Sequence, residues 1–206
     1  MSRMGAFLLA GWFCAVGAGA QAASVPPASG GGERIESGVV HTADGRLEKY
    51  RIRLRPITSF PNVPLPVVAQ LDQRGCMIPQ SFEAQRPENV IHGSFEGPGT
   101  SDWAVLCSVH GMVSLLVFFG SNPEHPYTLA SEPETERLQT YDLSQSLGFN
   151  WGIDRASPGD VSESQTRIFP PPPPLTHDAI ADSVVEHSTI YHYYSHGAWT
   201  LVQTQN

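Results

Sequence analysis

Residues 102–119 read DWAVLCSVHGMVSLLVFF and contain the clearest hairpin of the chain. The pair His110-Gly111 separates two apolar runs, and Gly111 can take the positive φ that a two-residue turn requires. In the second run, MVSLLVFF, both alternating faces are apolar, which is typical of a strand covered on both sides. We therefore expect a mainly β, β-rich α+β fold, with antiparallel hairpins around a buried central strand and one or two short helices.

Further hairpins are predicted on either side of this core. Near the N-terminus, SGVVHT and LEKYRIRLR flank Asp44-Gly45, a dipeptide that suits a type I′ turn. Near the C-terminus, STIYHYY and WTLVQT flank a turn at 195–198, where His196-Gly197 repeats the His-Gly of the core hairpin. HGMVSLLV and HGAWTLVQ are too short to decide whether the two hairpins arose by duplication.

The helices and spacers follow from other patterns. PVVAQLDQR begins with Pro66 and is followed by Gly75, which predicts a short helix there. DAIADSVVE (178–186) is a second helix candidate, and short strands are expected around 127–129, 138–142 and 149–153. Five prolines at 170–174 predict a stiff polyproline II spacer about 15 Å long.

Residues 1–22 have the features of a cleaved secretory signal peptide. Arg3 precedes an uncharged apolar stretch, and Ala20-Gln21-Ala22 offers the small-x-small pattern of a cleavage site. A membrane anchor is the alternative, for which the apolar run is marginal in length. Cleavage leaves a disordered Pro/Gly/Ser spacer at 23–34 and a single β-rich domain at 35–206. We expect a periplasmic or extracellular protein with no stable membrane span after signal cleavage.

Cys76 and Cys107 are the two cysteines that remain after signal cleavage. An even pair in an exported chain predicts one disulfide bond, with two free buried thiols as the alternative. The closed loop would contribute roughly 3–4 kcal/mol in the chain-entropy model.

The charge balance excludes nucleic acid as a partner. The formal net charge of the whole chain is −8, with 12 basic and 20 acidic residues, and loss of Arg3 makes it 11 − 20 = −9. One basic exception is a strand that places Arg51, Arg53 and Arg55 on one face. This face is either a solvated surface or a partner for the acidic residues that dominate after residue 87.

The stretch GSFEGPGTSDWAV (93–105) resembles an FG-GAP/VCBS-type repeat through its glycines, Phe95, Asp102 and the strand that follows, over residues 93–107. In that family alternating side chains bind calcium, and the matching positions here are Ser94, Glu96, Pro98 and Asp102. Calcium prefers six to eight oxygen ligands, mostly anionic. Because only Glu96 and Asp102 carry a charge, they are weak metal candidates, and we expect a structural turn without metal or cofactor.

A second, broader similarity indicates only a compartment. GCMIPQS (75–81), NVIHGSF (89–95) and DWAVLCS (102–108) are similar to segments of exported bacterial proteins that have no assigned activity.

No catalytic motif stands out. The sequence contains no nucleophile elbow, zincin motif or phosphate loop. His192 and His196 would lie roughly 13 Å apart on a strand, too far for one zinc ion. His177 and Asp178, with Asp182 one helical turn further on, form a slightly better metal set, although Asp178 also suits a helix cap. No catalytic residue is therefore assigned.

Aromatic residues near the C-terminus, Tyr191, Tyr193, Tyr194 and Trp199, are interpreted as packing residues, with a carbohydrate or protein contact as the alternative. The sequence is best interpreted as an exported, non-enzymatic binding or interaction protein of the cell envelope, whose partner is a protein or envelope component. The alternatives are a periplasmic hydrolase that uses His177 and Asp178, and a calcium-stiffened repeat-type module.

Overall fold

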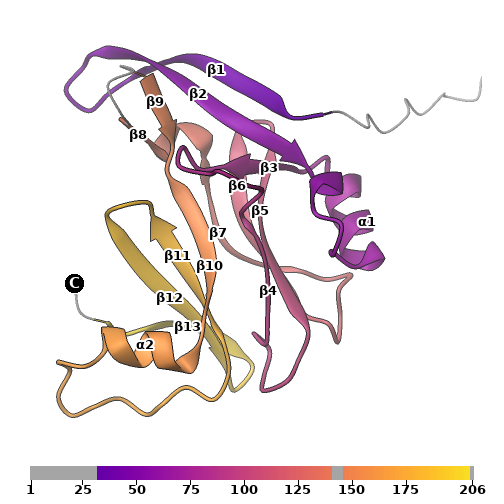
Figure 1. The fold of residues 1–206 in the computed structure, drawn as a ribbon, viewed down its shortest axis with the longest axis vertical. Helices are drawn as coiled ribbons and strands as arrows, with labels where there is room; N and C mark the ends of the chain where they lie inside the picture. The colour runs from indigo at the N-terminus through magenta and orange to yellow at the C-terminus, as the bar shows by residue number, and fades with distance from the viewer. Residues whose placement is uncertain (1–31, 141–145, 205–206) are drawn as a thin grey trace, which may run out of the picture.

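The hairpin predicted at 102–119 belongs to the larger of two sheets and has neighbouring strands on both sides (Figure 1). The computed structural model describes residues 32–140 and 146–204, and in it β5 (Asp102–Val109) pairs antiparallel with β6 (Met112–Phe118). His110 and Gly111 have φ angles of 51° and 79°, as a type I′ turn requires. Leu115 on one face of β6 and Phe118 on the other are both 0% exposed, so this strand is covered on both sides as predicted.

The larger sheet has nine strands in the order β7-β6-β5-β3-β2-β9-β8, with β1 added beside β2 and β4 beside β5. All of its pairs are antiparallel except β2 with β9. The strands other than β5 and β6 are β1 (Arg34–His41), β2 (Leu47–Pro56), β3 (Met77–Gln80), β4 (Val90–Gly93), β7 (Tyr127–Pro133), β8 (Leu138–Thr140) and β9 (Ser146–Phe149). The mainly β, antiparallel class predicted from the sequence is confirmed.

The β1–β2 hairpin is present, but its turn differs from the prediction. Gly45 alone has positive φ, 81°, and Thr42 N–H donates to the Arg46 carbonyl, so the loop has three residues instead of two. Such a loop places one glycine in the left-handed region, whereas a type I′ turn needs two positive φ angles. The predicted alternation along β2 is confirmed, because Ile52 and Leu54 are both 0% exposed. β1 already begins at Arg34, and the expected spacer before residue 32 lies outside the described residues, as does the expected signal peptide.

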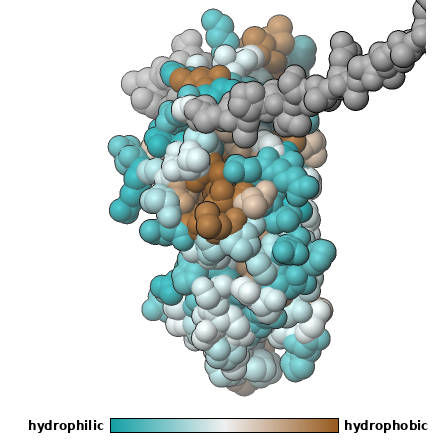
Figure 2. Space-filling model, turned by 90° about the vertical axis from the view of Figure 1, so that its right-hand side faces the viewer, coloured by the Kyte–Doolittle hydropathy of each residue, from teal (hydrophilic) through white to brown (hydrophobic). Residues whose placement is uncertain are grey.

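α1 (Leu65–Arg74) is the helix predicted before Cys76. It ends at Gly75, whose φ of 72° is left-handed, and the following residue forms the predicted disulfide with Cys107. Val67 and Leu71 of the helix pack into a core cluster that includes both cysteines. Figure 2 views the side of the molecule on which α1 lies, and a hydrophobic patch there is surrounded by mainly hydrophilic surface.

The second helix forms at a different place from the one predicted. α2 spans Pro158–Ser164 and begins with a capping box between Ser157 and Asp160. The predicted helix at 178–186 is wrong, because β11 (Ala179–Val184) occupies that stretch as a strand. β11 pairs on both sides, and these two ladders outweigh the helix propensity of its alanines. Two short 3-10 helices complete the structure, η1 (Ile57–Ser59) and η2 (Glu134–Glu136).

The smaller sheet runs in the order β10-β11-β12-β13 and contains β10 (Trp151–Ala156), β11, β12 (Ser188–Ser195) and β13 (Ala198–Val202). Its β12–β13 hairpin is the predicted closing hairpin, and His196-Gly197 adopts the same turn as His110-Gly111, with φ angles of 51° and 80°. The shared turn geometry leaves the question of duplication open.

One face of the smaller sheet packs against the larger sheet. Trp151, Ile153 and Ile180 of the smaller sheet share a buried cluster with Leu115 and Val117 of the larger one. The opposite face packs against α2 through a separate cluster around Val161. The two sheets thus enclose the main core, and loops of both meet at its rim (Figure 1). Within the described residues no helix is long and apolar enough to cross a membrane.

Candidate functional site

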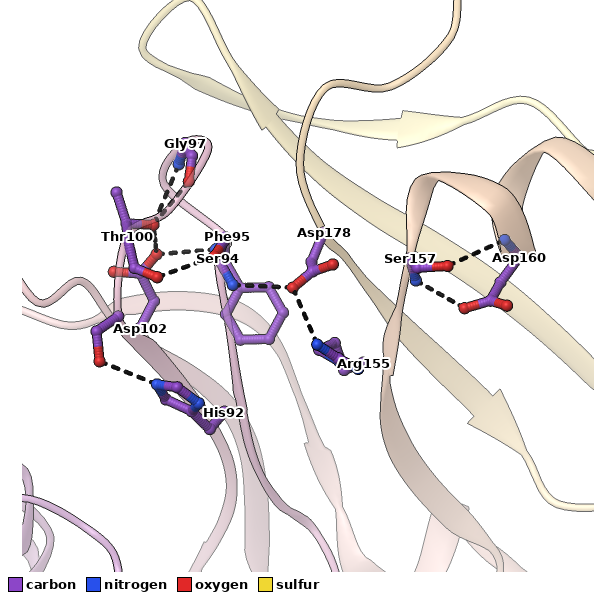
Figure 3. Close-up of polar contacts among 11 residues, drawn as sticks. His92, Ser94, Phe95, Gly97, Thr100, Asp102, Arg155, Ser157, Asp160 and Asp178 are labelled. Carbon is purple, nitrogen blue, oxygen red and sulfur yellow. Dashed lines mark hydrogen bonds and ion pairs between the residues drawn. The ribbon is translucent and has the colours of Figure 1, made fainter.

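The glycine-rich loop between β4 and β5 is organised by Asp102. This residue is fully buried, and one of its carboxylate oxygens accepts hydrogen bonds of 2.8 Å from both the Phe95 and the Glu96 N–H. The Thr100 hydroxyl donates to the same oxygen (Figure 3), and Gly120 N–H donates to the other at 2.8 Å. Four donors therefore surround the Asp102 carboxylate, and none of its positions faces an open cavity.

Glu96, the second metal candidate, does not converge with Asp102. Both of its carboxylate oxygens accept from the Ser121 hydroxyl, at 2.9 and 2.7 Å. The Ser94 hydroxyl donates to the Thr100 carbonyl at 2.9 Å. Among the described residues no three His, Cys, Asp or Glu side chains lie close enough together to hold a metal ion. The loop thus offers hydrogen-bond donors where a calcium site needs oxygen ligands.

His177 and Asp178 are neighbours in sequence, but their side chains serve different contacts. His177 Nε2 lies 2.9 Å from the Tyr194 carbonyl, which can only accept, so Nε2 carries the proton. Its Nδ1 lies 3.0 Å from the Tyr193 hydroxyl. Asp178 accepts instead from Ser94 N–H at 3.0 Å and lies 3.8 Å from Arg155 (Figure 3). The two side chains do not form an acid–base pair.

A buried polar network elsewhere in the smaller sheet was missed by the sequence analysis. Asp182 accepts from Trp151 Nε1 at 2.7 Å, and His192 Nε2 lies 3.0 Å from its other oxygen. All three residues are at most 8% exposed. A helix at 178–186 would give no reason to place Asp182 near His192. The register between β11 and β12 does so, because it sets Asp182 diagonally across from His192.

The smaller sheet divides the C-terminal aromatic residues between its faces. Tyr191 and Tyr193 pack on the α2 side, whereas Tyr194 and Trp199 reach the rim between the two sheets. There they meet two aromatic residues that the sequence analysis did not single out for a site, Phe119 after β6 and Tyr127 in β7. We call these four residues, Phe119, Tyr127, Tyr194 and Trp199, the aromatic cluster.

The rings of the aromatic cluster hold one another in position. The Phe119 ring centroid lies 4.8 Å from that of Tyr194 and 5.0 Å from that of Tyr127. Trp199 stacks on Phe119 at 5.9 Å and lies 5.3 Å from Tyr194. Because Phe119 is only 5% exposed while Tyr127 is 42% exposed, the cluster has a buried base and an accessible ring.

A pocket of about 400 Å³ opens onto this cluster. It is lined by Glu96, Phe119, Ser121, Asn122, His125, Pro126, Tyr127 and Tyr194. A hydrogen bond to Tyr127, burial and the negative charge of Glu96 all raise the pKa of Tyr194, so its phenol stays neutral. The pocket therefore places neutral ring faces beside one carboxylate.

Two other hollows are lined by other segments of the chain. One of about 440 Å³ lies beside Glu88 and Asp154, and burial followed by the charge of Glu88 raises the pKa of Asp154. The other, of about 160 Å³, includes Arg51 and Arg53. The Arg53 guanidinium already donates to two backbone carbonyls, those of Ser81 and Ala84.

The rest of the predicted basic face is partly neutralised. Arg55 forms an ion pair of 2.8 Å with Glu33, and not with the acidic residues after position 87. Arg51 is exposed, as expected for a solvated position on this strand.

Comparison with known proteins adds no relative. No family model matches this sequence, and neither a curated protein nor a solved structure does. The resemblance of residues 93–107 to an FG-GAP/VCBS repeat accordingly stays a prediction based on the loop residues alone. A functional conclusion has to come from the geometry of this chain.

Proposed function

We propose that this protein is an exported, non-enzymatic binding protein of the cell envelope, and that the pocket beside the aromatic cluster holds its ligand. The observation that carries the proposal is the accessible ring of Tyr127 next to the carboxylate of Glu96, in a pocket of about 400 Å³. Ligand sites in proteins have this range of volumes, and here three aromatic side chains stand beside polar ones, among them Glu96, Ser121 and His125.

The pocket is pre-organised, which favours binding. Tyr127 and Tyr194 are both packed against the buried Phe119, and Glu96 is held by the Ser121 hydroxyl. Little side-chain entropy would then be lost when a ligand enters, and this loss is one of the main costs of association. The walls come from the glycine-rich loop, the segment after β6, β7 and β12, so the complete fold is needed to build them.

The enzymatic alternative has less support. His177 and Asp178, the pair assigned to a hydrolase, are each engaged in contacts between segments of the chain. A general base has to reach a substrate proton, and the His177 ring has both nitrogens occupied by neighbouring groups. The calcium-stiffened module is likewise disfavoured by the four donors around Asp102.

Export is supported by the disulfide between Cys76 and Cys107. Disulfides persist mainly in oxidising compartments, so a periplasmic or extracellular location agrees with the signal peptide predicted at residues 1–22. The partner in such a location is a soluble ligand, a protein or an envelope component.

Ligand screening by nuclear magnetic resonance tests the binding function. The isotope-labelled protein is titrated with a panel of amines, amino acids and sugars, and the resonances of Tyr127 and Tyr194 are expected to shift for at least one class. Tyr127→Ala should abolish the response. Tyr191→Ala is the matched control, since this residue lies on the same strand as Tyr194 but packs on the opposite face. A panel that leaves the pocket resonances unchanged would reject the proposal.

A further inference from the structure

The carboxylate of Glu96 has no cationic partner. Both of its oxygens share the neutral hydroxyl of Ser121, and none of the ion pairs in the described part of the chain includes it. No lysine or arginine lines the pocket either. No lysine or arginine of the pocket therefore offsets the charge of Glu96, and His125 is the basic side chain that lines the pocket with it.

The ring faces add to this negative potential. An aromatic ring carries a quadrupole whose face is negative, and a cation above the face is attracted to it. Tyr127 and Tyr194 line the same pocket as Glu96, and their centroids lie 5.9 Å apart. The raised pKa of Tyr194 agrees with this picture, since the charge of Glu96 contributes to it.

Other ligand classes fit less well. An anion would meet the carboxylate of Glu96 with like charge. A bare metal ion would find only this one carboxylate in the pocket, too few anionic oxygens for calcium. A neutral sugar could stack on Tyr127 and donate a hydroxyl to Glu96, but it would leave the negative charge uncompensated.

We propose that the group bound in this pocket is an organic cation, an ammonium with alkyl substituents, held over the faces of Tyr127 and Tyr194 beside the Glu96 carboxylate. This inference rests on the proposed binding function and names its ligand class. The same head group can belong to a small free amine or to the side chain of a cationic peptide.

Two ligands of equal shape and different charge test the proposal. Choline is compared with its neutral isostere, the alcohol in which a carbon atom replaces the ammonium nitrogen, by resonance titration in low-salt buffer. Choline should bind at least about tenfold more tightly, which corresponds to about 1.4 kcal/mol and lies within the range of buried cation–π contacts. A capped lysine and a capped norleucine repeat the comparison for the peptide form of the cation.

Variants separate charge from shape. Glu96→Gln should lower the choline affinity about three- to tenfold and leave the affinity for the isostere unchanged. Tyr127→Leu keeps an apolar wall but removes the ring. It should also reduce the difference in affinity between choline and its neutral isostere. Glu124→Gln is the matched control, because this exposed acid of the adjacent loop does not line the pocket.

The outcomes distinguish this inference from the binding function itself. Equal binding of choline and its isostere at the pocket would overturn the cation proposal and leave the binding function standing. Binding of a sugar alone would do the same. If no member of the whole panel shifts the pocket resonances, both proposals fail.

Discussion

Asp102 shows how one buried carboxylate can organise a loop through its hydrogen bonds. Its carboxylate gathers N–H and hydroxyl donors from the glycine-rich loop and from the segment after β6. The positive ends of these groups point at the place where a cation would have to sit. Millimolar calcium should therefore leave the thermal unfolding midpoint where EDTA leaves it, because an ion that does not bind the folded state cannot stabilise it. An upward shift with calcium in a melting experiment would contradict this interpretation.

A substitution at the same residue tests its hydrogen bonds. Asp102→Asn replaces one acceptor oxygen with an NH₂ group, which then faces an N–H donor in a fully buried site. The loss of at least one acceptor should lower the free energy of unfolding by about 2–3 kcal/mol in urea denaturation. Glu96→Gln, on the same loop but held only by a surface serine, should change it by less than about 0.5 kcal/mol.

Glu134 gives a pH dependence whose sign follows from its burial. Burial raises the pKa of this carboxyl, and the Ser108 hydroxyl that donates to it offsets the effect only in part. Between the ordinary and the raised pKa the folded state holds the proton more often than the unfolded state does. The contribution of Glu134 to stability is thus greatest at acidic pH and is lost as the pH rises through the raised pKa.

Glu134→Gln should remove the loss of stability at high pH, because an amide does not ionise. The variant is expected to be more stable than the wild type at about pH 8. The difference should shrink towards about pH 4, where the carboxyl is mostly protonated in both the folded and the unfolded state. Urea denaturation at the two pH values measures the difference. A gap that does not depend on pH would mean that the carboxyl is not buried in solution.

At the scale of single elements, β6 is a strand whose side chains are buried on both faces. Leu115→Ala should reduce the free energy of unfolding by about 2–4 kcal/mol, through lost transfer energy and the cavity left behind, since this side chain is 0% exposed. Met112 on the same strand is 41% exposed, and Met112→Ala should cost less than about 0.5 kcal/mol. Urea denaturation of the two variants measures both losses of stability. Equal losses would show that Leu115 is not buried as the structure places it.

Elements with strong local signals were predicted correctly. The His-Gly turns, α1 with its terminal Gly75 and the two-sided apolar pattern of β6 each depend on a few adjacent residues. β11 was mistaken for a helix because its alanines and small polar residues carry no strand period. Its strand conformation comes from pairing with β10 and β12, which local propensity does not describe.

At the scale of the whole molecule, the Cys76–Cys107 disulfide links the end of α1 to the central hairpin. It spans 31 residues. The adjacent strands β3 and β5 pair at one position, Met77 opposite Ser108. Replacing both cysteines by alanine should lower the free energy of unfolding by about 3–4 kcal/mol, mainly by freeing the unfolded chain. Unfolding of the double variant in urea measures this loss, and an unchanged midpoint would show that the bond does not constrain the molecule.

The sequence by itself determined the features that depend on neighbours in the chain or on covalent chemistry. These include the mainly β class, the hairpin at 102–119 and the pairing of the only two cysteines after the predicted signal peptide. Each follows from side-chain type, alternation or turn chemistry within a short stretch.

Only the tertiary structure decided where the pocket lies and which residues line it. Phe119, Tyr127 and Tyr194 come from separate segments, and Glu96 reaches them because Asp102 and Ser121 fix its loop. His192 contacts Asp182 only because of the strand register in the smaller sheet. Contacts between distant segments depend on how two sheets pack, and the free energy of that packing is spread over the whole core, so no local pattern records it.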